Sequence, residues 1–235
     1  MPATPIAERG YANPDLLADT GWLAAHLDDA DLRLIDTRSA QLYEAGHIPG
    51  AVNLAAHGSV PRAANGDIGT PEEFEALARR LGVSPDSTVV VYDAPGAQMG
   101  SVAWAFSYFG HGGVRVLDGG YEKWTAENRP TSTTRGSYPP GGFEAHLVEG
   151  IFCSLDHAKS AHGKPGTVFW DVRRPGEYDG SEALNNPRPG HIAGAVHLEW
   201  TELLDSETRT FKPAAALRSL LESRGITPES EIDCY

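Results

Sequence analysis

Two stretches of the sequence decide the fold, Leu34-Ile-Asp-Thr-Arg38 and Gly46-His-Ile-Pro-Gly-Ala-Val-Asn-Leu54, because both return in the second half of the chain. The first returns as Phe169-Trp-Asp-Val-Arg173, 135 residues further on, and the second as Gly190-His-Ile-Ala-Gly-Ala-Val-His-Leu198, 144 residues further on. The larger second offset places a nine-residue insertion in the second copy, within Glu177 to Arg188. Ordered matches at nearly constant spacing indicate a tandem duplication of one domain type.

A third match extends the repeat to the end of the chain. Gly82-Val-Ser-Pro-Asp-Ser-Thr-Val-Val-Val-Tyr92 corresponds to Gly225-Ile-Thr-Pro-Glu-Ser-Glu-Ile-Asp-Cys-Tyr235 at an offset of 143. The position after Tyr235 would therefore correspond to Asp93. We expect a first domain at residues 1–129, a Pro-, Gly- and Ser/Thr-rich linker at 130–147, and a second domain at 148–235 that is truncated before its loop. This predicts that the chain is a cleaved or truncated form, or a part, of a longer protein.

Composition restricts the class of protein. The 235 residues fit two domains of ordinary size, and 22% charged with 40% hydrophobic residues is typical of soluble globular chains. No apolar run reaches the length of a membrane helix, and the N-terminus lacks a secretion signal, which favours the cytoplasm. A net charge of −13 argues against nucleic acid as a partner. A local positive pocket could still bind a small anion.

Alternating strand and helix patterns predict an α/β fold. Short apolar runs at Leu32 to Ile35, Val89 to Tyr92 and Val114 to Leu117 are typical of buried parallel strands. Thr70-Pro-Glu-Glu73 has the pattern of a helix capping box with proline at the first helical position. In each copy we expect a mainly parallel sheet covered by helices on both faces, the second copy being incomplete. Ligands of such sheets bind beyond the carboxyl ends of the strands.

The motifs together resemble the tandem-domain rhodanese family, the thiosulfate and 3-mercaptopyruvate sulfurtransferases. They are the Asp-x-Arg after a strand, Gly-His-Ile-Pro-Gly-Ala, a strand that ends in tyrosine, and Leu117-Asp-Gly-Gly-Tyr-Glu-Lys-Trp124. The resemblance covers almost the whole chain. It implies a sulfurtransferase in which a cysteine follows the strand of the second domain. As a persulfide, this cysteine would move a sulfane sulfur from a small anionic donor to a thiol or cyanide. The resemblance implies no cofactor and favours a monomer.

The same resemblance assigns different roles to the two copies. In the first copy, Asp93 occupies the position of the nucleophile and cannot carry a sulfane sulfur, so we expect that domain to be catalytically silent. In the second copy, the nucleophile is expected immediately after Tyr235, so no residue of this chain is assigned as catalytic.

Two arginines are candidates for substrate binding. Arg188 lies in the inserted stretch beside the second Gly-His-Ile motif, where mercaptopyruvate-type members carry a substrate arginine, and a solvated loop charge is the alternative. Arg174 is the second candidate. Glu177 stands where some members have another substrate arginine, and this difference argues against thiosulfate as the preferred donor.

The cysteines and histidines have structural interpretations. Cys234 corresponds to Val91 within a strand, and Cys153 precedes an expected helix, so we interpret both as small buried residues and not as nucleophiles. His47 and His191 lie in turns with no second ligand at metal-binding spacing, so no metal site is expected. Asp233 corresponds to Val90 in the middle of a buried strand, and the sequence offers no explanation for it.

Two other functions stay open at this point. A catalytically inactive rhodanese-like module would bind a partner or an anion and would show no sulfur transfer. A phosphatase would use a similar cysteine loop to hold an oxyanion, but such sites need a longer loop.

Overall fold

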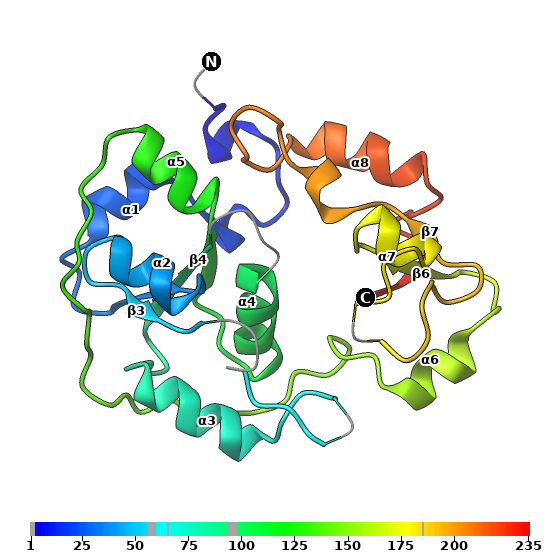
Figure 1. Cartoon of the computed structure of the whole chain (residues 1–235), viewed down its shortest axis with the longest axis horizontal. Helices are drawn as coiled ribbons and strands as arrows, with labels where there is room; N and C mark the ends of the chain where they lie inside the picture. The colour runs from blue at the N-terminus through cyan, green and yellow to red at the C-terminus, as the bar shows by residue number, and fades with distance from the viewer. Residues whose placement is uncertain (1–2, 56–59, 65, 94–97, 185) are drawn as a thin grey trace. The chain divides into compact units, whose positions relative to one another are not determined.

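The computed structural model describes residues 3–55, 60–64, 66–93, 98–184 and 186–235. The chain forms two compact units, each built around a parallel sheet (Figure 1). Unit 1 comprises Met1–Ala7 and Ala12–Phe152, and unit 2 comprises Glu8–Tyr11 and Cys153–Tyr235. The predicted α/β fold with two parallel sheets is confirmed. Within the described ranges, no helix is long and apolar enough to cross a membrane.

Unit 1 contains a five-stranded sheet with the strand order β1-β5-β4-β2-β3, in which every pair is parallel. Its strands are β1 (Leu17–Ala18), β2 (Leu32–Asp36), β3 (Val52–Asn53), β4 (Thr88–Tyr92) and β5 (Val114–Leu117). Its helices are η1 (Ile6–Glu8), η2 (Pro14–Leu16), α1 (Thr20–His26), α2 (Ala40–Ala45), α3 (Pro71–Arg80), α4 (Gln98–Tyr108) and α5 (Gly120–Ala126). The three strands predicted from apolar runs are confirmed.

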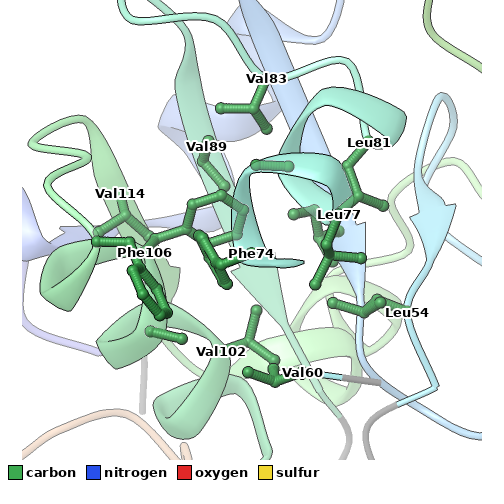
Figure 2. Close-up of a cluster of buried hydrophobic side chains, with 14 of the residues drawn as sticks. Leu54, Val60, Phe74, Leu77, Leu81, Val83, Val89, Val102, Phe106 and Val114 are labelled. Atoms are coloured by element: carbon green, nitrogen blue, oxygen red, sulfur yellow. The ribbon is translucent and has the colours of Figure 1, made fainter. Parts of the chain in front are cut away.

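Strand β4 shows why both faces of this sheet are buried. Val89 and Val91 belong to one apolar cluster, and Val90 and Tyr92 belong to another, because successive side chains of a strand point to opposite faces. The first cluster contains residues of α3 and α4, including Phe74 and Phe106, whose rings pack edge to face (Figure 2). The second contains residues of α1, α2 and α5. An uninterrupted run of valines is therefore the pattern of a central parallel strand.

Helix α3 begins as its sequence predicts. The Thr70 hydroxyl accepts a hydrogen bond from the backbone of Glu73, and the Glu73 carboxylate accepts one from the backbone of Thr70. This reciprocal capping box satisfies two backbone donors that the first helical turn leaves without partners. It fixes the start of the helix that carries Phe74 into the core.

Unit 2 contains a three-stranded parallel sheet with the order β7-β6-β8. Its elements are α6 (Leu155–Ala161), β6 (Thr167–Asp171), α7 (Pro175–Asp179), β7 (Val196–His197), η3 (Trp200–Leu203), α8 (Ala214–Glu222) and β8 (Glu231–Cys234). Strands β6 and β8 correspond to β2 and β4, with Phe169 beside Asp233 where unit 1 has Leu34 beside Val90. The chain segment Glu8–Tyr11 also belongs to this unit, where Arg9 and Tyr11 donate hydrogen bonds to the carbonyl of Phe211.

The segment predicted as the linker runs along unit 1 through repeated backbone hydrogen bonds. Ser132 pairs with His47, and the amide of Phe143 donates to Val83. A Cβ at Gly141 would lie 1.9 Å from the carbonyl oxygen of Val83, so only glycine allows this close approach.

Candidate active site

The site of unit 1 is built at the carboxyl ends of β2 and β4. Asp36 ends β2, is fully buried, and accepts hydrogen bonds from the backbone and the guanidinium of Arg38. The Arg38 side chain is 3% exposed and also donates to the carbonyl of Gly46 at 2.7 Å. The pair thus joins the strand end to the start of the Gly-His-Ile turn.

Tyr92 at the end of β4 joins Asp36 and Arg38 in one hydrogen-bonded group. We call this group, and its counterpart in unit 2, the frame. Its hydroxyl donates to Asp36 Oδ2 at 2.8 Å and accepts from the backbone amide of Ile48 at 3.1 Å. Burial and the negative charge of Asp36 raise the pKa of Tyr92 far above its ordinary value, so the hydroxyl stays protonated. The tyrosine therefore fixes the position from which the following loop departs.

Unit 2 rebuilds the same frame from the second copy of the motifs. Asp171 accepts from the backbone of Arg173 at 3.0 Å and from its guanidinium at 2.5 Å, and Arg173 also donates to Gly190. The Tyr235 hydroxyl accepts from the amide of Ile192 at 3.0 Å, as Tyr92 does from Ile48. Although burial opposes ionisation, the hydrogen bonds from Arg173 keep the pKa of Asp171 below its ordinary value. Both Asp-x-Arg sequences therefore form local ion pairs.

The histidines of the two turns contact backbone carbonyls. His47 is fully buried, with its ring nitrogens 2.8 Å and 2.9 Å from the carbonyl oxygens of Tyr43 and Thr134. His191 approaches the carbonyl of Tyr178 at 2.7 Å. Each ring stacks on a tyrosine at 3.8 Å between centroids. These contacts fit the structural role expected from the sequence.

Asp93 follows Tyr92 directly and is 7% exposed. Its carbonyl accepts a hydrogen bond from the amide of Tyr121 at 2.9 Å, which ties the strand end to α5. The loop of residues 94–97 lies outside the described residues, and α4 begins at Gln98. A buried carboxyl group therefore stands at the position where the family resemblance places a nucleophile.

Arg174 caps the start of α7 and is exposed. Its guanidinium lies 3.3 Å from a carboxylate oxygen of Glu177 and 3.5 Å from one of Glu182. A donor anion would have to compete with these two carboxylates for Arg174. The sequence did not reveal the contact with Glu182, because it depends on how the inserted stretch folds back.

Arg188 is exposed within the inserted stretch. The base of this stretch is narrow, since a Cβ at Gly180 would lie 3.1 Å from the backbone nitrogen of Gly190. The Gly190 carbonyl is itself bound by Arg173. Arg188 is thus two residues from Gly190, whose carbonyl accepts a hydrogen bond from Arg173.

Neither cysteine has the surroundings of an activated thiol. Burial and the carboxylate of Asp233 raise the pKa of Cys153 to about 11. Although Cys234 as a whole is exposed, desolvation of its sulfur by the surrounding residues and the charge of Asp171 raise its pKa to about 11 as well. A thiol with such a pKa holds little thiolate at neutral pH.

The expectation that Cys234 is buried was wrong. The residue lies in a strand as predicted, but it is exposed because β8 is an edge strand of the described sheet. Its neighbour Ile232 is 42% exposed for the same reason.

The sequence did not predict one group of side chains of metal-ligand type. Cys153 and His157 at the start of α6 meet Asp233 of β8. No local spacing signals this group, but a comparison of the two copies position by position could have found it, because its members stand where the first copy has apolar residues.

Comparison with known proteins finds a matching family model and similar chains. Residues 19–127 match the family model described as the rhodanese-like domain. The chain is 38% identical to the sulfur carrier protein TtuD of Thermus thermophilus, over 96% of this chain and 84% of the relative. It is 34% identical to a thiosulfate sulfurtransferase of Azotobacter vinelandii, over 94% of this chain and 82% of the relative.

A solved structure shows the same fold. The chain superimposes on SseA from Escherichia coli, described as a 3-mercaptopyruvate sulfotransferase with the rhodanese fold, with a TM-score of 0.81 and 26% identity. The match covers 93% of this chain and 87% of that one.

Proposed function

Because this chain belongs to the rhodanese family, we propose that its second domain accepts a sulfane sulfur on a cysteine and transfers it to a thiophilic acceptor. The relatives with named activities are sulfurtransferases, and one is a sulfur carrier. The donor would be thiosulfate or 3-mercaptopyruvate, and the acceptor a thiol or cyanide.

One observation carries this proposal. Unit 2 repeats the hydrogen bonds of unit 1. The Tyr235 hydroxyl bonds to Asp171 and to the amide of Ile192, as the Tyr92 hydroxyl bonds to Asp36 and to the amide of Ile48. The residue that follows Tyr235 would therefore leave the sheet where Asp93 does in unit 1. In the family this position opens a loop before a helix, where backbone N–H groups and the helix dipole favour a thiolate.

The chemistry is a double displacement at sulfur. The thiolate would attack the outer sulfur of thiosulfate, whose S–S bond breaks to leave sulfite, or the thiol sulfur of 3-mercaptopyruvate, whose C–S bond breaks. In the second case the enolate that leaves takes up the proton of the thiol and becomes pyruvate. The acceptor would then attack the outer sulfur of the cysteine persulfide and regenerate the thiolate. No oxidant or metal is needed for either step.

Under the same proposal, unit 1 does not catalyse sulfur transfer. The Asp93 carboxyl can occupy the position of a thiolate, but it has no sulfur to which a sulfane atom could be attached. Unit 1 would keep the fold of the family without its reaction.

Arg174 and Arg188 are the proposed donor-binding residues. Both proposed donors are anions, and both arginines are exposed in the stretch of chain that joins β6 to β7. The carboxylates beside Arg174 make Arg188 the stronger candidate, since no described contact neutralises Arg188.

The test is sulfur transfer by the complete protein, measured as thiocyanate formed from cyanide with each donor. We expect activity that is lost when the cysteine expected after Tyr235 becomes serine and that is retained in Asp93→Ala. Arg188→Ala should raise the KM for the donor by about 10- to 150-fold, as removal of one charged hydrogen bond costs about 1.5–3 kcal/mol. Absence of transfer from both donors, with a folded protein, would support the inactive binding module instead.

A further inference from the structure

Three side chains of metal-binding type converge in unit 2 away from the proposed nucleophile position. Cys153, His157 and Asp233 each offer one ligand atom, and these atoms lie within 4.8 Å of one another. Asp233 Oδ2 lies 3.9 Å from His157 Nε2. The trio joins the start of α6 to the middle of β8.

Asp233 is the informative member of this group. The residue is only 9% exposed, and its Oδ2 has no hydrogen-bond partner among the described residues. A buried carboxylate oxygen without a hydrogen bond, whose contact with His157 Nε2 is as long as 3.9 Å, is costly, so such a group is normally found closely paired or bound to a metal. The strand that carries it would be more stable with an apolar residue.

The repeat shows what the polar trio replaces. Helices α1 and α6 and strands β2 and β6 align at one offset of 135, and β4 aligns with β8 at an offset of 143. The three positions therefore correspond to Ala18, Trp22 and Val90. Ala18 and Val90 are buried in one apolar cluster of unit 1, and the partly buried Trp22 packs against it, so unit 2 has cysteine, histidine and aspartate at three positions that are apolar in unit 1.

The helix cap fixes the relative positions of the cysteine and the histidine. Ser154 is the N-cap of α6, and its hydroxyl accepts from the backbone of His157 at 3.1 Å. In unit 1, Asp19 accepts from the backbone of Trp22 in the same way. Cys153 directly precedes this cap and His157 lies in the first turn after it, and their ligand atoms lie within 4.8 Å of each other.

From this juxtaposition we propose that Cys153, His157 and Asp233 form a zinc-binding site. Thiolate, imidazole and carboxylate are the three ligand types that Zn²⁺ accepts, and a soft thiolate selects it over Mg²⁺ or Ca²⁺. On binding, the Cys153 thiol releases its proton to solvent. The fourth position is filled by water or by Glu231, whose carboxylate lies 2.9 Å from His157 Nε2.

The arrangement needs a modest contraction to hold the ion. With bonds of about 2.0–2.3 Å, the ligand atoms of a tetrahedral zinc site are about 3.3–3.8 Å apart. The widest separation of 4.8 Å must therefore close by about 1 Å, which side-chain rotation of the exposed His157 allows. Metal on Nε2 would displace the contact with Glu231.

Such an ion would fasten α6 to β8. Strand β8 leads directly to Tyr235, so the metal would stabilise the strand that positions the proposed nucleophile. The site is separate from sulfur transfer, and its test does not depend on activity.

The experiment is metal binding by the chelator-treated, reduced protein. We expect one equivalent of Zn²⁺ to bind and to raise the thermal unfolding temperature. One equivalent of Co²⁺ should give the near-ultraviolet charge-transfer absorption of a thiolate ligand. Cys153→Ser should abolish that absorption.

Two conservative variants and a matched control complete the test. Asp233→Asn and His157→Gln should each weaken zinc binding by more than about 100-fold, since even outer-shell changes cost 10–100-fold. Cys234→Ser and a serine in place of the cysteine expected after Tyr235 are the controls for the other thiols, and each should bind as the unchanged protein does. Circular dichroism reports whether each variant is folded. The proposal is overturned if the unchanged protein binds no zinc at micromolar concentration, or if binding depends on Cys234 and survives Cys153→Ser.

Discussion

The two units carry the same frame in different surroundings. Asp36 and Asp171 are both fully buried and both bind an arginine two residues later, but the Arg38 side chain is 3% exposed whereas that of Arg173 is 25% exposed. The apolar core is also less extensive in unit 2 than in unit 1. Two clusters lie in unit 1, and one cluster of Ala161, Phe169 and Ala195 lies in the described part of unit 2. A short local sequence thus specifies the frame, and the rest of the domain decides how much water reaches it.

The largest effect should come from transferring the aspartate of unit 2 to unit 1. Val90→Asp places an unpaired carboxylate in a fully buried strand position and should cost about 4 kcal/mol or more of the free energy of unfolding of unit 1. In metal-free protein, the reverse change Asp233→Val should stabilise unit 2 by about 1–3 kcal/mol. Hydrogen exchange read separately in β4 and β8 measures both changes. Destabilisation by Asp233→Val without metal would contradict the comparison.

Breaking the ion pair of each frame should rank next. Asp36→Ala leaves the buried Arg38 uncompensated and should cost about 3–5 kcal/mol. Asp171→Ala should cost less, about 1–2 kcal/mol, because solvent reaches Arg173. Urea denaturation of the two variants tests this order, with Arg135→Ala, which removes an exposed pair with Glu44, as the control. Equal costs in the two units would show that exposure does not control the strength of the pair.

A smaller effect on stability is expected from a group of hydrogen bonds around Glu127, which we call the clasp. Among the described residues, it occurs in unit 1 alone. Glu127 accepts hydrogen bonds from Lys123, Thr20 and Arg129, and although burial opposes ionisation, these contacts lower its pKa to about 2. Because the pKa is lower in the folded state than the ordinary 4.5, the stabilisation is complete above pH 4.5 and is lost as the pH falls toward 2.

The substitution Glu127→Gln should therefore cost about 1–2 kcal/mol at pH 7, allowing for solvent screening of this partly exposed group, and the cost should vanish near pH 2. Unfolding measured across this range gives the dependence. In unit 2 the position of Thr20 is taken by Leu155, which is 64% exposed. A difference between Glu127→Gln and the unchanged protein that stays constant from pH 7 to pH 2 would rule out the clasp.

The sequence predicted the features that depend on neighbouring residues. The capping box at Thr70, the valine strand β4 and the Asp-x-Arg pairs all follow from short patterns, and all are present. The repeat itself predicted the two parallel sheets.

Features that depend on distant packing were not predicted. The contact of Arg174 with Glu182 requires the inserted stretch to fold back on α7, and the exposure of Cys234 follows from the edge position of β8. The convergence of Cys153 and His157 with Asp233 depends on how α6 packs on β8, which no local spacing specifies. Comparing the two copies position by position would have revealed the trio, since each member replaces an apolar residue.

The central claim is that unit 2 carries the sulfur and unit 1 does not. It is tested most directly by incubating the complete protein with thiosulfate or 3-mercaptopyruvate and mapping the added sulfur by peptide mass spectrometry. Our account predicts a mass increase of one sulfur atom on the cysteine directly after Tyr235, with Cys153 and Cys234 unchanged. Sulfur found on Cys153 or Cys234, or on no residue after both donors, would contradict it.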